Sequence, residues 1–208
     1  MSPVCSRGYR GTSTSMSALP AVRKIWTPEE YLAWERLQPE KHDYHDGDVF
    51  GMAGATFEHN QIVANVIGEL RSLLRQKPCK VCAPDLRIKV PATGLYTYPD
   101  VSVVCDRPEF EDDQLDTLLN PLLLVEVLSA STEDYDRGTK FTNYRTIPAL
   151  RDYVLLSTER VLVEYHTRKE DSSWLLREFR AGQRFHLESI GCELIVDELY
   201  LKVFDAQP

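Results

Sequence analysis

A short apolar run that contains a single acidic residue constrains the fold of this chain more than any other feature. The run covers 121–128, and Glu126 is its one charged member. A continuous run rich in Leu and Val is typical of a strand buried on both faces of a sheet. A carboxylate in such a strand is costly unless it is paired, protonated or bound to a metal. The run therefore indicates an α/β protein with a chemically active carboxylate in a central strand.

A second carboxylate opens the preceding β-branched segment. Asp100 follows Pro99 and precedes 101–104, which we predict to be a strand. Two carboxylates at the ends of neighbouring strands suit Mg²⁺, which takes oxygen ligands and usually keeps several waters. A nearby lysine would orient a water or stabilise charge on a phosphate, and Lys140, in the helix expected after the Glu126 strand, is the candidate.

These residues resemble the signature of the PD-(D/E)XK nuclease superfamily, which has the restriction-endonuclease-like fold. Within it, the chain is similar to a family of restriction endonucleases first described as a domain of unknown function. The similarity covers nearly everything from Thr27 to the C-terminus. It rests on three motifs. The Pro-Asp strand start stands at 99–100, and the Glu-Val-x-Ser-x-Ser strand end stands at 126–131. The Asp-x-x-x-Lys-x-x-x-Tyr helix is represented by Asp136, Lys140 and Tyr144.

The resemblance implies a central mixed β-sheet flanked by helices, with an antiparallel meander at the C-terminal end. It implies an Mg²⁺ or Mn²⁺ ion held by Asp100, Glu126 and the main-chain carbonyl of Val127. Leu128 stands where the superfamily motif has its lysine, so the resemblance implies that Lys140 has taken over that role. It also implies DNA as the nucleic-acid partner and a homodimer.

Three further features have two interpretations each. Asp43, before the hairpin turn signal at 46–47, matches an acidic position of the family. It is either a third catalytic carboxylate or a solvated strand residue. His59, in the first turn of a helix expected at 57–76, is either a surface capping residue or part of the site. Lys140 and Asp136, four residues apart, form either a surface ion pair or part of the site.

Composition limits the remaining classes. A net charge of −8 over 208 residues argues against a protein that coats nucleic acid non-specifically. No apolar run approaches the roughly 20 residues of a membrane span. Five cysteines without a secretion signal predict reduced thiols in the cytoplasm. Cys79 and Cys82 have no partner pair for zinc, so we interpret them as entering a strand.

The chain is expected to hold one domain at 21–208 after a disordered extension at 1–20. A capping box at Thr27 predicts a helix, and the meander is expected at 153–157, 161–165 and 174–179, before a last segment at 195–199. The acidic stretch 106–116 indicates a solvated loop. The leading functional hypothesis is a metal-dependent endonuclease. The alternatives are an inactive nuclease-fold binding or assembly module and a hydrolase of another phosphoester.

Overall fold

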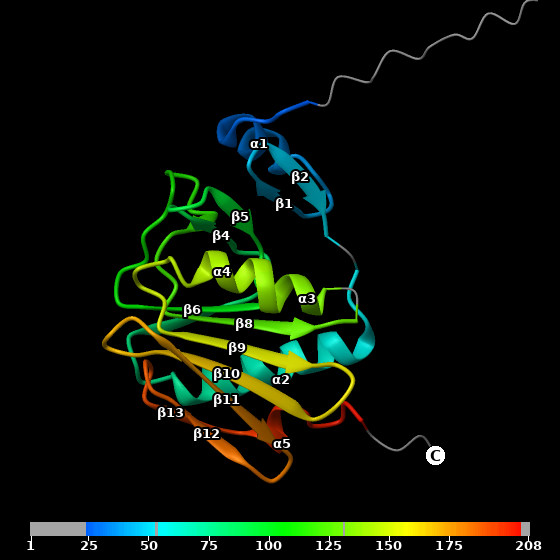
Figure 1. Cartoon of the computed structure of the whole chain (residues 1–208), viewed down its shortest axis with the longest axis vertical. Helices are drawn as coiled ribbons and strands as arrows, with labels where there is room; N and C mark the ends of the chain where they lie inside the picture. Colours follow the sequence, from blue (N-terminus) through cyan, green and yellow to red (C-terminus); the bar gives the residue numbers. More distant parts are fainter. Residues whose placement is uncertain (1–23, 53, 131, 205–208) are drawn as a thin grey trace, which may run out of the picture.

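The strands of the computed structural model, which describes residues 24–52, 54–130 and 132–204, form three sheets (Figure 1). The first is a five-stranded sheet of β2 (Asp48–Gly51), β1 (His42–His45), β5 (Leu95–Thr97), β4 (Arg87–Val90) and β7 (Thr117–Leu118), in that order. The second is a six-stranded sheet of β11 (Trp174–Arg180), β10 (Leu162–Arg168), β9 (Asp152–Ser157), β8 (Leu123–Leu128), β6 (Val101–Cys105) and β3 (Cys79–Cys82), in that order. The third is the hairpin of β12 (Arg184–Leu187) and β13 (Cys192–Ile195).

Helices cover both faces of the six-stranded sheet (Figure 1). The helical segments are α1 (Pro28–Glu35), α2 (Phe57–Leu73), α3 (Glu133–Tyr135), η1 (Asp136–Lys140), α4 (Phe141–Tyr144) and α5 (Val196–Leu199). Helix α2 packs on one face, whereas α3, η1 and α4 run over the other. No helix in the described part of the chain is both long and apolar enough to cross a membrane.

The side-chain alternation of β8 determines where Glu126 points. All six residues of this strand are buried, as its sequence predicts. The odd-numbered residues pack in the same core cluster as α2. Leu124 and Leu128 pack in the other cluster, together with Tyr144 of α4. Because successive strand residues face opposite sides, Glu126 shares the face of Leu124 and Leu128 and meets η1 and α4.

The N-terminal part of the chain forms a second layer above the helices of that face (Figure 1). The Thr27 side chain accepts a hydrogen bond from the main-chain N–H of Glu30, and the Glu30 side chain accepts one from that of Thr27, which is the predicted capping box. Asp46 and Gly47 both have positive φ, as the predicted two-residue hairpin turn requires. This hairpin carries Asp43 on β1.

Two expectations about the sheets need correction. The strands do not form one central sheet, because the chain leaves the six-stranded sheet after β3 and enters the five-stranded one at β4. The last segment, expected at 195–199, is preceded by a hairpin of β12 and β13 that was not expected, and most of it is α5. The meander of β9, β10 and β11 is antiparallel as predicted. The prediction for residues 1–20 concerns positions outside the described residues, and so does position 131, the last of the Glu-Val-x-Ser-x-Ser motif.

The cysteines also differ from expectation, because Cys79 and Cys105 form a disulfide. They face each other across the antiparallel pair of β3 and β6, where side chains come close together. Cys82 and Cys192 are free thiols, as predicted. Cys79 and Cys82 begin and end β3, as their interpretation as strand residues requires.

Reduction of this disulfide is expected to lower the free energy of unfolding. The crosslink joins two residues with a sequence separation of 26 and limits the conformations of the unfolded chain. This lowered entropy of the unfolded chain stabilises the folded state by about 3 kcal/mol. Guanidinium titrations with and without dithiothreitol measure the difference, and Cys82→Ser, which leaves the crosslink intact, is the control. Identical midpoints with and without reductant would contradict the assignment.

Candidate active site

The carboxylate of Glu126 is buried at the centre of a hydrogen-bonded cluster. Its side chain is 3% exposed. The Lys140 ammonium donates to Glu126 Oε1 at 3.0 Å, and the Tyr144 hydroxyl donates to the same oxygen at 2.9 Å. Both donors come from the segment that crosses this face of the sheet, so the predicted spacing of Lys140 and Tyr144 brings both to Glu126.

Lys140 is shared by two buried carboxylates. Asp136 Oδ1 lies 3.1 Å from Lys140 Nζ, and neither side chain is more than 7% exposed. Burial alone would lower the pKa of Lys140, but the nearby carboxylates, Glu126 foremost, raise that pKa well above its ordinary value. Lys140 is therefore a cation held inside the protein, and the interpretation of Asp136 and Lys140 as a surface pair is wrong.

The turn that holds these two residues is a π-helix, which the sequence does not reveal. Segment η1 runs from Asp136 to Lys140, between α3 and α4. Such wide turns are rare inside helices and are frequent at functional sites. Within this turn Asp136 and Lys140 contact each other, and Lys140 also reaches Glu126.

Asp100 stands beside Glu126 at the start of β6. Its Oδ2 accepts a hydrogen bond from the main-chain N–H of Val127 at 2.7 Å. His59 Nε2 lies 3.2 Å from the same oxygen. The N-terminal turn of α2 thus places His59 against Asp100, and its role in the site stays a prediction. Val127 contacts Asp100 through its N–H, and the predicted metal contact of its carbonyl stays a prediction.

Asp43 approaches the cluster from the other layer. It is 6% exposed, which excludes the solvated interpretation. The Tyr135 hydroxyl lies 3.4 Å from its Oδ2, and its Oδ1 has no hydrogen-bond partner among the described residues. Burial raises the pKa of Asp43 above its ordinary value, although the Lys140 ammonium opposes that shift.

Replacing Asp43 with asparagine is expected to stabilise the protein at neutral pH by about 1 kcal/mol. Because the pKa of Asp43 is raised in the folded state, the folded state binds this proton more tightly than the unfolded state. The wild type therefore loses stability relative to Asp43→Asn as pH rises above about 4. Urea titrations at pH 4 and pH 7 test this, with the exposed Asp113→Asn as control. A difference that does not grow with pH would contradict it.

Carboxyl groups outnumber ammonium groups in this cluster. Glu126, Asp136 and Asp43 all act electrostatically on the Lys140 ammonium, and burial raises the pKa of Glu126 despite that ammonium. Among the described residues, however, no three His, Cys, Asp or Glu side chains are placed to hold a metal ion together. A metal would therefore depend on Asp100, Glu126, a main-chain oxygen and water. Mg²⁺ accepts such a set, so the residues present fit it.

Other acidic residues lie outside this cluster. Asp85 pairs with Lys41. In the acidic stretch 106–116, Asp112 and Asp116 both bind Arg36. These ion pairs anchor the loop to the end of α1.

The rim of the site is apolar where β2 leads into α2. Phe50 is 52% exposed and is the cross-strand partner of Asp43, so the two side chains share one face of the hairpin. Met52 and Phe57 are also exposed. No sequence pattern singles out these residues, because exposure at a hairpin end depends on how the two layers meet.

A family comparison agrees with the motifs. Residues 28–197 match the model of the family Uma2, described as "Putative restriction endonuclease". The chain belongs to the Uma2 family. The match begins at α1 and includes every residue of the cluster, so the site lies within the part that Uma2 proteins share.

Two relatives and one solved structure resemble this Uma2 protein. Two uncharacterized proteins of Synechocystis sp. are 41% and 35% identical to it, over 84% and 81% of the chain and 90% and 94% of their own lengths. The crystal structure of a "putative nuclease belonging to DUF820" from Anabaena variabilis superposes with a TM-score of 0.68 at 16% identity. That match covers 83% of this chain and 96% of the other, and it shows a shared fold.

Proposed function

We propose that the protein is a metal-dependent endonuclease that hydrolyses phosphodiester bonds in DNA. The observation that carries the proposal is the contact of buried Lys140 with Glu126 at 3.0 Å, with Asp100 on the neighbouring strand. Two carboxylates beside a fixed cation are the groups that hydrolysis of a phosphodiester needs. Membership of the Uma2 family supports the same reaction class.

Each side chain has a proposed role. Asp100, Glu126 and the carbonyl of Val127 would hold Mg²⁺ or Mn²⁺, which when bound would polarise a phosphoryl oxygen and lower the pKa of a water. Lys140 orients the attacking water and stabilises negative charge on the phosphate.

The remaining groups support these residues. Tyr144 holds Glu126 in place through its hydroxyl, and His59 holds Asp100. Asp43 assists as a third carboxylate. We further propose that the six-stranded sheet with α2 is the restriction-endonuclease-like core, and that the protein acts as a homodimer in the cytoplasm.

One observation favours an inactive binding or assembly module instead. Lys140 and Tyr144 already satisfy Glu126 Oε1, so the carboxylate has partners without a metal. The net charge of −8 points the same way, because it weakens attraction to DNA.

A cleavage assay separates these functions. Pure protein is incubated with supercoiled plasmid, single-stranded DNA, RNA and a small phosphodiester, in Mg²⁺, Mn²⁺ or EDTA. The proposal predicts DNA cleavage that needs metal. Cleavage of the small phosphodiester alone would indicate a different phosphoesterase. No cleavage of any substrate in either metal would contradict the proposal and support the inactive module.

A further inference from the structure

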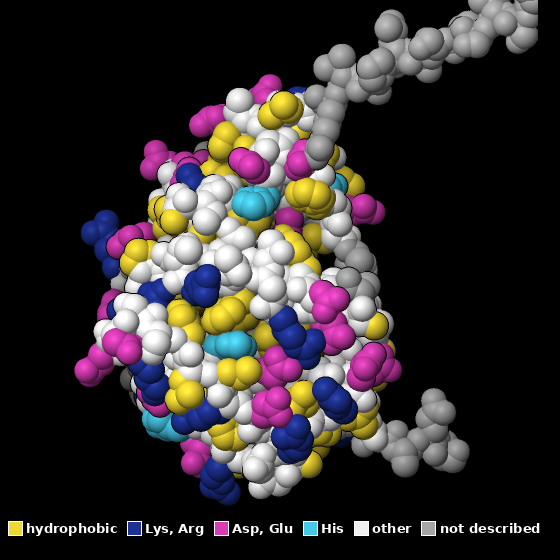
Figure 2. Space-filling model, in the orientation of Figure 1, with side chains coloured by type: hydrophobic (Ala, Val, Ile, Leu, Met, Phe, Trp, Pro, Cys, Tyr) yellow, Lys and Arg dark blue, Asp and Glu magenta, His cyan; other side chains and the backbone are white. Residues whose placement is uncertain are grey.

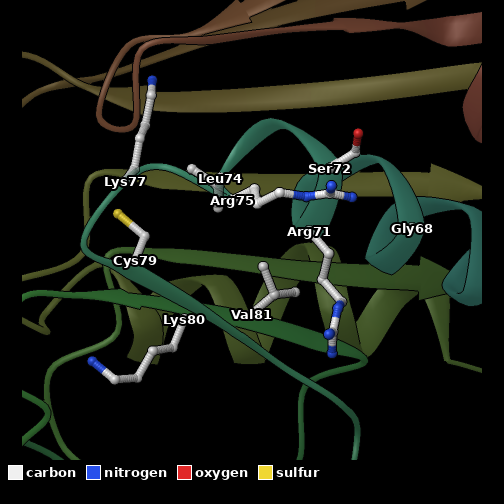
Figure 3. Close-up of a pocket in the computed structure, with 9 residues that line it drawn as sticks. All are labelled: Gly68, Arg71, Ser72, Leu74, Arg75, Lys77, Cys79, Lys80 and Val81. Carbon is white, nitrogen blue, oxygen red and sulfur yellow. The ribbon is translucent and has the colours of Figure 1, made fainter.

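A basic groove lies between the end of α2 and β3, in the layer opposite α3 and α4. It is a hollow of about 600 Å³ whose lining includes Arg71, Arg75, Lys77 and Lys80 and no acidic residue (Figure 3). The chain as a whole has a net charge of −8, whereas the lining of this groove contains four basic residues and no acidic one. On the face shown in Figure 2, by contrast, acidic and basic side chains alternate without a continuous basic stripe.

The two lysines of the basic groove are held by neutral groups. Lys77 Nζ donates to the main-chain carbonyls of Ile190 at 2.6 Å and Gly191 at 2.7 Å. Lys80 Nζ donates to the carbonyl of Asp106 at 3.1 Å. These bonds fix the positions of the ammonium groups, and neither group forms an ion pair with a carboxylate among the described residues.

The two arginines of the basic groove are free to bind an anion. Arg71 and Arg75 are exposed and have no hydrogen-bond or ion-pair partner among residues 24–52, 54–130 and 132–204. Arg36 and Arg137, by contrast, each bind carboxylates. A cation in the last turn of a helix offsets the helix dipole, which explains why an unpaired arginine stands at Arg71. Arg75 lies after the end of the helix, so this explanation does not apply to it. Each free guanidinium matches the two oxygens of a phosphate.

Helix α2 connects this groove to the candidate active site. His59 in its first turn contacts Asp100, and Arg71 lies in its last turn. Their separation of twelve residues corresponds to about 18 Å along the axis. One strand of a duplex advances about 3.4 Å per nucleotide, so about five nucleotides would cover that distance.

We propose that the basic groove binds the phosphate backbone of a nucleic acid about five nucleotides from the bond placed at Glu126. The proposal rests on the proposed function for its substrate class. The groove supplies affinity that does not depend on sequence, because it contains cations for phosphates and no element that reaches base edges. It would offset the repulsion expected from a chain of net −8.

Binding measured without cleavage tests the groove. Anisotropy of a labelled 30-base-pair duplex is measured in EDTA over a series of salt concentrations, for the wild type and for Arg71→Ala/Arg75→Ala. Loss of two phosphate contacts should weaken binding about tenfold and reduce the salt slope by about two. Arg145→Ala, an exposed arginine after α4 on the other face of the sheet, is the matched control and should change neither. Equal binding by wild type and double variant would overturn the proposal, as would equal loss in the control.

The assay separates this proposal from the proposed function. Metal-dependent cleavage by the wild type, with unchanged binding in the double variant, would overturn the proposed role of the groove and leave the proposed nuclease activity standing. Weakened binding in the double variant, with no cleavage in any metal, would support the groove and overturn the nuclease. If Arg71→Ala/Arg75→Ala lost binding of inorganic pyrophosphate but bound the duplex as the wild type does, the groove would be a site for a free anion and the nucleic-acid proposal would be overturned. A wild type that binds no nucleic acid would also overturn it.

Discussion

Replacing Glu126 with glutamine is expected to lower the rate of metal-dependent DNA cleavage by at least about 100-fold. The change keeps the size of the side chain and an oxygen that can accept the bonds from Lys140 and Tyr144. It removes the negative charge that would hold a cation beside Asp100. Lys140 keeps Asp136 as a charged partner, so the fold should remain.

The Glu126 prediction is checked by initial rates of plasmid cleavage in Mg²⁺ and Mn²⁺, with the thermal unfolding midpoint as a control for folding. Tyr144→Phe is the matched variant, because it removes one hydrogen bond to Glu126 and leaves the charge in place. It should lower the rate less than Glu126→Gln does. A Glu126→Gln protein that cleaves within about threefold of wild type would show that this carboxylate is not part of the chemistry.

Replacing Lys140 with methionine is expected to have the largest effect on stability, about 3–5 kcal/mol. The change leaves Glu126 and Asp136 buried without the cation that both contact. The cost should be smaller at low pH than at neutral pH. Burial already raises the pKa of Glu126, and without Lys140 that carboxyl takes up a proton more readily as pH falls.

A double variant separates the structural role of Lys140 from its chemical role. Glu126→Gln/Lys140→Met removes both charges of the buried pair and should recover much of the lost stability, because no charge at Glu126 is left uncompensated. It should remain inactive. Urea titrations measure the recovery. Arg184→Met, which breaks the exposed pair with Glu193, is the control and should cost at most about 1 kcal/mol. A double variant no more stable than Lys140→Met would contradict a direct interaction.

Local sequence signals predicted the elements that hold the site. The apolar run at 121–128 contains a fully buried strand, Leu123–Leu128, and strand alternation explains why Glu126 faces α4. The turn at Asp46 and Gly47 and the capping box at Thr27 rest on interactions between near neighbours, which the sequence encodes directly. The division into two sheets depends on how β3 and β4 pair with distant strands, and no local pattern determines it.

Only part of the site could be predicted, because the sequence shows local patterns but not the contacts between distant segments. Asp100, Glu126 and Lys140 could be chosen because a carboxylate in an apolar strand and a lysine on the next helix are visible in the sequence. The contact of His59 with Asp100 and the approach of Tyr135 to Asp43 join segments far apart in the chain. The disulfide between Cys79 and Cys105 likewise depends on the register of two strands.

The proposed hydrolysis of DNA by this buried cluster requires a metal ion and both charged residues. It is tested by conversion of supercoiled plasmid by the wild type and by Glu126→Gln/Lys140→Met, in Mn²⁺ and in EDTA, because the double variant is expected to stay folded. Nicked and linear plasmid are expected only for the wild type in Mn²⁺. Equal conversion by both proteins, or conversion by the wild type in EDTA, would show that the cluster does not carry out this reaction.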